Sequence, residues 1–147
     1  MNNIINIYTD GACIGNPGPG GWAALIIINN KEELLFGNSP STTNNRMEML
    51  AVIHAIESIG VKSNLIINTD SKYIINGIST WIKIWKKSNW LTSNKNKVKN
   101  MDLWKKLDHI SSKHVIRWEW IKGHSGNVNN EKVDTVAREQ ALKLSEN

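Results

Sequence analysis

The segment from Ile4 to Asp10 constrains the fold most, because isoleucines and a tyrosine there precede a carboxylate that is followed at once by glycine. β-Branched and aromatic residues over such a length favour a strand that is at least half buried. A charged side chain where this strand stops lies at an edge of the sheet, where α/β folds bind ligands. Asp10-Gly11 alternatively suits a tight hairpin turn, but a stronger turn signal follows at residues 15–21.

Length and composition indicate one domain, residues 1–147, in a reducing compartment. A chain of 147 residues buries roughly two thirds of its unfolded surface, which is enough for a core without disulfides. The single cysteine, Cys13, has no partner for an internal disulfide, and no signal segment opens the chain. No apolar run approaches the ~20 residues of a membrane span. We therefore expect a cytoplasmic protein that does not enter a membrane.

The positive charge of the chain is concentrated in one interval. The formal net charge is +5, yet no acid lies between Asp70 and Asp102, where seven lysines occur. Within it, residues 81–99 (the basic segment) combine tryptophans with lysines. On a helix Trp81 and Trp85 share a face, with lysines broadly opposite. Such a patch indicates nucleic-acid binding, although buried aromatics beside ordinary solvated lysines would look similar.

The remaining pattern predicts an α/β fold. Strands are expected at 22–28 and, more weakly, at 33–36, forming an antiparallel meander with the first strand. Apolar residues at helical spacing predict a helix from Met49 to Ile59, ending at Gly60. Further helices are expected after Ser71, from Leu103 to Ile110 and after Asn130, and a last strand at 115–121.

Residues 65–69 repeat the arrangement of the first strand, since a short apolar run again ends in a carboxylate, Asp70. A strand that follows a helix after a meander suggests a crossover, which would make it parallel to the first strand. Asp70 would then lie at the same sheet edge as Asp10. Alternatively, Asp70 caps the helix behind it.

Three further residues are candidates for the same edge. Glu48 flanks the apolar stripe of its helix and could reach across the sheet edge, although Asn45 to Glu48 also has capping-box spacing. Asp134 is expected in the first turn of the final helix, where the helix dipole stabilises a carboxylate anyway. His124 lies between glycines, where it could shuttle protons or be a plain surface histidine.

Four carboxylates brought together would repel one another unless a cation neutralised them. An all-oxygen ligand set favours Mg²⁺, with Mn²⁺ as a possible substitute, whereas zinc would require a cluster of softer ligands. Two such ions can activate a water and stabilise the leaving oxygen during in-line attack on phosphorus. Together with the basic segment, the acids point to a polymeric phosphodiester substrate.

Five motifs together resemble bacterial type 1 ribonuclease H, in order and over nearly the whole chain. They are Tyr8-Thr9-Asp10-Gly11-Ala12, Thr42-Thr43-Asn44-Asn45-Arg46-Met47-Glu48, Asn68-Thr69-Asp70-Ser71, Gly123-His124-Ser125-Gly126 and Asn130-Glu131-Lys132-Val133-Asp134-Thr135-Val136-Ala137-Arg138. The resemblance implies a five-stranded mixed sheet, with three strands in an antiparallel meander plus two parallel strands, and helices on both faces. It implies endonucleolytic cleavage of the RNA strand of RNA/DNA hybrids, leaving 5′-phosphate and 3′-hydroxyl ends.

The resemblance also implies roles for individual residues. Asp10, Glu48, Asp70 and Asp134 are expected to bind the metal ions, and His124 to assist proton transfer or product departure. The basic segment, with Trp81, Trp85, Lys86 and Lys87, is expected to grip the DNA strand. Asn16, Asn44 and Asn45 resemble minor-groove contacts that sense the 2′-hydroxyl, while Thr43 and Asn100 resemble a pocket for a DNA phosphate.

One departure from the family pattern is Lys72, where glutamine is expected; a cation there could bind a phosphate or perturb Asp70. We expect a monomer without an obligate protein partner. Two alternatives stay open at this point: a nuclease of the same fold that acts on DNA, and a catalytically silent module that only binds hybrids.

Overall fold

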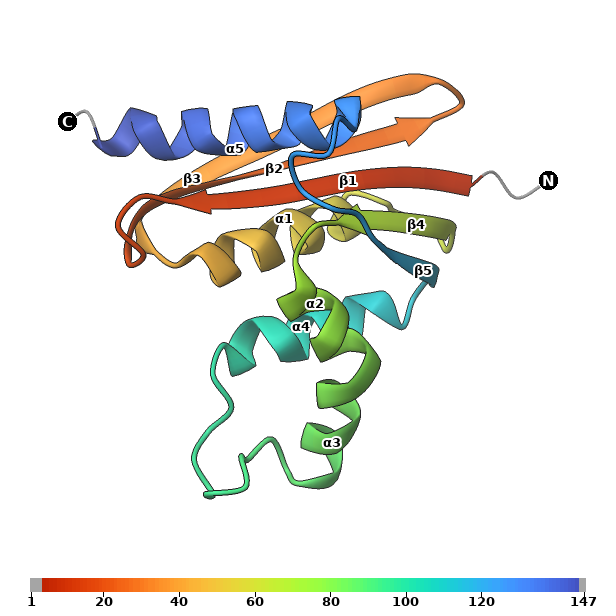
Figure 1. Ribbon diagram of the computed structural model, residues 1–147. Coiled ribbons are helices and arrows are strands. Elements are labelled where there is room, and N and C mark those ends of the chain that lie inside the picture. Colours follow the sequence, from red (N-terminus) through yellow and green to blue (C-terminus); the bar gives the residue numbers. More distant parts are fainter. Residues whose placement is uncertain (1–3, 146–147) are drawn as a thin grey trace.

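The computed structural model describes residues 4–145, which form one mixed sheet with helices packed on it (Figure 1). The strands are β1 (Ile4–Cys13), β2 (Gly18–Ile28), β3 (Lys31–Thr42), β4 (Asn64–Thr69) and β5 (Val115–Trp120). The helices are α1 (Asn44–Glu57), α2 (Lys72–Asn76), the π-helix η1 (Gly77–Trp81), α3 (Ile82–Lys87), α4 (Met101–Ser111) and α5 (Val128–Ser145). None of the described helices is long and apolar enough to cross a membrane.

The topology of the sheet confirms the predicted fold class. Among the described residues the sheet has five strands in the order β3-β2-β1-β4-β5. The first three form the antiparallel meander, β4 runs parallel to β1, and β5 runs parallel to β4. The parallel pairing of β1 with β4 ends at Thr9 and Thr69. An aspartate follows each of these threonines in the chain, so the pairing places Asp10 and Asp70 at one edge.

The two faces of the sheet are covered by different helices (Figure 1). On one face α5 packs Val133 and Ala137 against Ala23 and Leu25 of β2. On the other face α1 buries its apolar side, and the main core continues from there to Trp104 of α4. Burial at about 25 cal/mol per Å² makes this continuous apolar core the main stabilising contribution. The sheet that carries Asp10 is thus covered by α5 on one face and by α1 on the other.

The chain reverses within the predicted segment 15–21, but β1 is longer and the turn shorter than predicted. β1 continues through Gly11 to Cys13, so Asp10-Gly11 is not a turn. The chain reverses after Cys13, where the Ile14 amide donates to the Pro19 carbonyl at 2.8 Å. Gly20 and Gly21, predicted as turn residues, lie within β2 instead. A Cβ atom on Gly21 would lie 2.3 Å from the Ala137 carbonyl oxygen, so this glycine allows α5 to approach the sheet.

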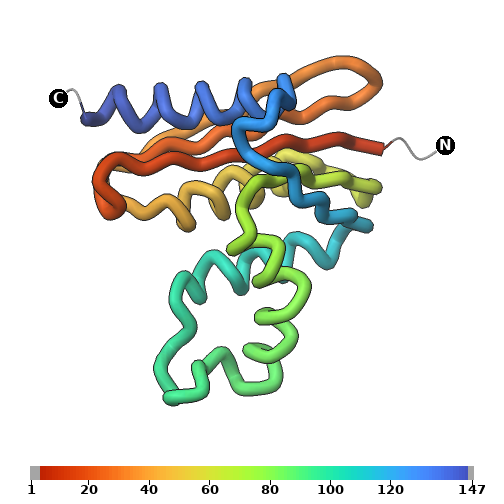
Figure 2. Tube along the Cα trace, in the orientation of Figure 1, coloured from red at the N-terminus to blue at the C-terminus, as the bar shows by residue number. Residues whose placement is uncertain are grey.

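The basic segment projects away from the sheet on the side of α1, as the chain trace also shows (Figure 2). Its tryptophans join Tyr73 and Trp104 in an aromatic cluster, with ring centroids 5.2 Å apart for Tyr73 and Trp104 and 6.0 Å apart for Trp85 and Trp90. The lysines of the segment are exposed. The predicted division into a packed aromatic side and a cationic exposed side is therefore confirmed.

Gly77 is required where η1 crosses Trp104, and its replacement provides a test of this packing. A Cβ atom on Gly77 would lie 2.0 Å from the Trp104 ring, which is completely buried. Gly77→Ala should therefore lower the free energy of unfolding by about 1 to 3 kcal/mol, the usual effect of overpacking a core. Urea unfolding followed by circular dichroism measures this change.

Gly60→Ala is the matched control, because a Cβ atom on Gly60 meets nothing within 4 Å. Its free energy of unfolding should stay within about 0.5 kcal/mol of the parent value. Equal stability of the two variants would show that η1 does not depend on close contact with Trp104.

Candidate active site

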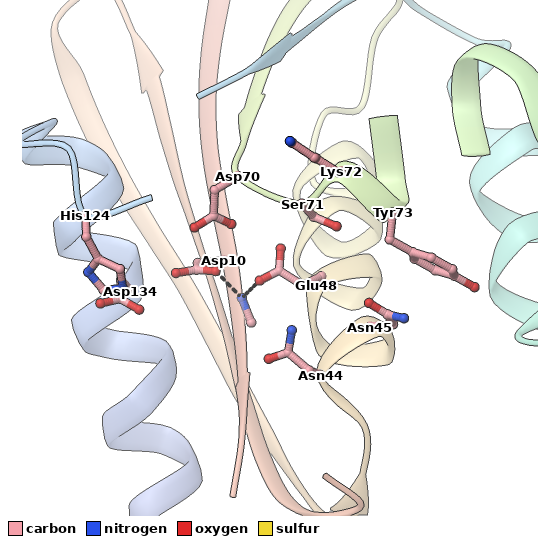
Figure 3. Close-up of a pocket in the computed structure, with 11 residues that line it drawn as sticks. Asp10, Asn44, Asn45, Glu48, Asp70, Ser71, Lys72, Tyr73, His124 and Asp134 are labelled. Atoms are coloured by element: carbon pink, nitrogen blue, oxygen red, sulfur yellow. Dashed lines mark hydrogen bonds between the residues drawn. The ribbon is translucent and has the colours of Figure 1, made fainter. Parts of the chain in front are cut away.

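Asp10 and Glu48 meet at the backbone of Gly11 (Figure 3). The Gly11 amide donates to Glu48 Oε1 at 2.7 Å and to Asp10 Oδ1 at 2.9 Å. Both carboxyl side chains are buried, with 3% exposure for Glu48 and 4% for Asp10. The capping-box interpretation of Glu48 is wrong, because Thr43 caps α1 and its hydroxyl accepts from the Arg46 amide. Glu48 instead reaches across to β1.

This meeting depends on the absence of a side chain at Gly11. A Cβ atom there would lie 2.4 Å from the Glu48 backbone nitrogen and 2.6 Å from the Met47 carbonyl carbon. Contacts that short require the backbone of α1 to shift. Glycine therefore lets α1 approach β1 closely enough for the Glu48 carboxylate to reach the strand.

Asp70 follows β4 and completes a three-carboxylate cluster. One carboxylate oxygen each from Asp10, Glu48 and Asp70 lie within 4.8 Å of one another. The interpretation of Asp70 as a helix cap is wrong, because Ser71 caps α2 and accepts from the Ile74 amide at 3.2 Å. Asp70 is therefore free of a capping role and faces the other acids.

Asp134 and His124 border the same cavity on the side of α5 (Figure 3). Asp134 lies in the second turn of α5, not in the first turn as predicted, because the helix begins at Val128. It forms an ion pair with Arg138 at 3.0 Å. His124 is exposed, on the loop between β5 and α5. Both residues therefore face the cavity without joining the three-carboxylate cluster.

Burial and mutual repulsion shift the protonation of the cluster. Burial raises the pKa of Asp10 from 3.8 to about 6, and repulsion by Asp70 acts in the same direction, against the hydrogen bond from the Gly11 amide. Burial also raises the pKa of Glu48 well above its usual range, with Asp10 contributing. The pKa of Asp70 is raised by burial and by Asp134, while attraction by His124 opposes this. Within residues 4–145 the surrounding side chains thus compensate the ionised cluster only incompletely.

The residues of this cluster fit a hard divalent cation. Glu48 Oε2 is buried and has no hydrogen-bond partner within residues 4–145. An unpaired carboxylate oxygen in such a place is costly unless it binds a donor or an ion. The cluster consists of carboxylates only, which is a ligand set for Mg²⁺ or Mn²⁺.

Three of the predicted substrate contacts line this cavity, and three others are connected to the start of α1. Asn44, Asn45 and Lys72 border it, and the Asn16 side chain accepts from the Asn44 amide at 2.9 Å. Thr43 caps α1 beside them. Asn100 is the N-cap residue of α4, and its side-chain oxygen accepts from the Arg46 guanidinium at 3.2 Å. The structure therefore gathers the Asn16, Thr43 and Asn44 set at the start of α1.

The predicted contacts of the basic segment lie on α3 and η1, away from the acids. Trp81 and Trp85 are half-buried in the aromatic cluster. Lys86 forms an ion pair with Asp108 at 2.8 Å, whereas Lys87 is exposed on the last turn of α3. Lys87 is therefore the more available cation of the two.

Sequence reasoning missed three residues of the site. Ser71 and Tyr73 border the cavity beside Asp70. Trp120 ends β5 and donates its indole N–H to the Asp70 carbonyl at 3.1 Å. The parallel alignment of the last strand would have identified Trp120, since the carboxyl ends of parallel strands share an edge.

The raised pKa of Asp10 predicts a pH-dependent stability. The folded protein binds this proton more tightly than the unfolded chain, so stability without metal falls as the pH rises from 3.8 to about 6. Asp10→Asn removes this loss. The metal-free variant should be more stable than the parent above pH 6, by about 1 to 3 kcal/mol, and the difference should disappear below pH 4. Urea unfolding in EDTA at several pH values measures it.

Asp102→Asn is a control of opposite sign. The hydrogen bond with Arg46 lowers the pKa of Asp102, so this carboxylate stabilises the fold at neutral pH and less in acid. Its replacement should destabilise the protein at pH 7. A destabilising effect of Asp10→Asn at pH 8 without metal would contradict the assignment of Asp10 as an uncompensated charge.

Comparison with known proteins places this arrangement in one family. The family model described as RNase H matches residues 2–142. The chain is 52% identical over 137 residues to a ribonuclease H of Alcanivorax borkumensis, covering 93% of this chain and 90% of the relative. It is 47% identical to the ribonuclease HI of Neisseria meningitidis serogroup B, covering 99% and 100%.

Solved structures agree with the sequence comparison. LC9-RNase H1, described as a type 1 RNase H with the type 2 active-site motif, superposes with a TM-score of 0.88 at 28% identity, covering 98% of this chain and 74% of that one. The matches extend over nearly the whole chain and include the segments that carry the acids. The chain therefore belongs to the ribonuclease H family of endoribonucleases.

Proposed function

We propose that the chain hydrolyses the RNA strand of RNA/DNA hybrids, with Mg²⁺ held by Asp10, Glu48 and Asp70, and with Asp134 at the rim of the site. The observation that carries this proposal is the cluster of three carboxylates within 4.8 Å on a ribonuclease H fold. The buried, unpaired Glu48 Oε2 supports a cation in the resting enzyme, and Mn²⁺ would suit the same ligands.

Divalent ions at such a cluster supply an activated water and neutralise the charge that develops on the phosphate. The protein contributes rigid placement, because Gly11 holds two of the carboxylates by hydrogen bonds. His124 lies on an exposed loop at the cavity, where an imidazole can pass a proton to or from solvent. Cleavage would leave a 5′-phosphate and a 3′-hydroxyl.

Recognition of the hybrid is assigned to two surfaces. The amides of Asn16, Asn44 and Asn45 would read the minor groove, where the 2′-hydroxyl distinguishes RNA from DNA. The side-chain oxygen of Asn16 accepts a hydrogen bond from the Asn44 amide, which holds these two residues together. The basic segment, together with Thr43 and Asn100, would hold phosphates of the DNA strand.

We propose a single catalytic domain over residues 1–147 that acts as a monomer in the cytoplasm without an obligate protein partner. The basic segment is supported by its own aromatic cluster, with Trp85 and Trp104 centroids 5.6 Å apart, and so it would serve as a preformed binding surface.

Cleavage of a strand-labelled RNA/DNA hybrid tests the proposal. With Mg²⁺ only the RNA strand should be cut, and EDTA should prevent cutting. RNA/RNA and DNA/DNA duplexes serve as controls. Asp10→Asn should abolish turnover by removing a charged ligand, while hybrid binding measured by fluorescence anisotropy stays largely intact.

Three other outcomes would contradict parts of the proposal. Cutting of the DNA duplex as readily as the hybrid would identify a nuclease of the same fold that acts on DNA. Tight hybrid binding without cleavage under Mg²⁺ would identify a silent binding module. Unchanged turnover of Asp10→Asn would remove Asp10 from the metal site.

Charge removal in the basic segment should weaken binding and reduce its dependence on salt. Replacing Lys86 and Lys87 together by alanine should raise KM and lower the slope of log Kd against log salt by about one to two. Lys87→Ala alone should account for most of this, because Asp108 already pairs with Lys86. A loss in kcat at unchanged affinity would show that the segment has another role.

A further inference from the structure

Lys72 carries a positive charge into the rim of the acidic cavity without pairing with any of its acids. It borders the same cavity as Asp10 and Asp70 (Figure 3). Within residues 4–145 no ion pair joins its ammonium group to a carboxylate. Its Nζ atom instead lies 5.0 Å from the centroid of the Trp120 ring. The ammonium group thus rests on an indole face.

Trp120 is itself held in place by the backbone that carries Asp70. Its indole N–H donates to the Asp70 carbonyl at 3.1 Å, and Trp120 is paired with Thr69 in the parallel register of β5 and β4. Trp120 as a whole residue is nevertheless 44% exposed. A fixed, exposed indole beside a cluster of acids provides a defined resting place for a cation.

We propose that Trp120 holds the Lys72 ammonium group beside the acids, where it binds a phosphodiester of the hybrid next to the one being cut. This inference rests on the proposed function, since it assumes that the nucleic-acid backbone crosses the cavity. The indole attracts the cation through its electron-rich face but brings no negative charge. The ammonium group therefore stays available to a phosphate.

The contact with the indole also keeps the Lys72 ammonium group from pairing with the metal ligands. A lysine at the rim of an acidic cavity is attracted by every ionised carboxylate in it, and an ion pair with Asp70 would compete with a divalent cation. The contact with Trp120 holds the ammonium group out of such a pair. Lys72 is thus a substrate-binding residue, and Trp120 is the positioning residue that keeps it from the acids.

Hybrid binding tests the role of Lys72. In the non-cleaving Asp10→Asn background, Lys72→Met should weaken the affinity about three- to tenfold and lower the salt slope by about one, as for one lost phosphate contact. The control is Lys62→Met, since this exposed lysine precedes β4, at the opposite edge of the sheet. Equal effects of Lys72→Met and Lys62→Met in anisotropy titrations would overturn the proposal.

Metal binding tests the role of Trp120. We expect Trp120→Leu to weaken Mn²⁺ binding about three- to tenfold, measured from the spectrum of free Mn²⁺ by electron paramagnetic resonance. Lys72→Met added to Trp120→Leu should restore the affinity, because no ammonium group remains to pair with the acids. Trp120→Phe keeps a ring but loses the bond to Asp70, and should bind Mn²⁺ like the parent.

Two results would contradict this role. Weak Mn²⁺ binding that persists in the double variant, or equal weakening by Trp120→Phe and Trp120→Leu, would assign the effect to the lost Asp70 bond. These measurements need no turnover, so they separate the inference from the proposed function. Failure of the parent to cut any hybrid would refute the function, whereas normal cutting with unchanged hybrid affinity of Lys72→Met would refute only the inference.

Discussion

The whole site depends on a change of strand neighbours along β1. Through Thr9 this strand pairs with β4, but β4 ends at Thr69 while β1 continues against β2 to Cys13. The edge of β1 beyond Thr9 is therefore open, and the Gly11 amide on this edge needs an acceptor. Glu48 supplies it from α1 at 2.7 Å. One unpaired backbone group thus links the sheet to the helix and draws the carboxylates together.

This arrangement concentrates charge where the fold can least accommodate it. Burial raises the pKa of Asp10 to about 6 and raises the pKa of Glu48 well above its usual value, so both carboxyl groups resist ionisation. Natural active sites commonly retain such unfavourable groups because the bound ion or substrate reverses their effect. The surrounding core must supply the compensating stability, and its apolar residues between α1, α4 and the sheet are almost completely buried.

The sequence was sufficient for the elements and the acids, and insufficient for contacts between distant elements. Residue periodicity located the strands and helices, and parallel pairing brought Asp10 and Asp70 to one edge as expected. Predictions from short sequence motifs were wrong where contacts between distant elements determine the local structure. Glu48 has capping-box spacing, but Thr43 is the N-cap residue of α1, and Glu48 accepts from the Gly11 amide instead. Gly21 looked like a turn residue, yet it lies in β2 because α5 packs directly upon it. The position of Trp120 beside Asp70 follows from the register of β5 with β4, which the sequence does not contain.

The helices on either side of the basic segment, α2 and α4, are connected to each other and to α1 by polar contacts as well as by the aromatic cluster. The Tyr73 hydroxyl accepts from Asn100 and from the Trp104 indole, each at 3.1 Å. Arg46 joins the start of α1 to Asp102 of α4 by two hydrogen bonds, of 3.0 and 2.8 Å. Tyr73 lies on α2, three residues after Asp70, and Arg46 lies on α1, two residues before Glu48, so these contacts start close to the acids in the chain. These contacts connect the helices that flank the basic segment to the helix that carries Glu48, so under the proposed function a hybrid held by the basic segment would meet the carboxylates in a defined register.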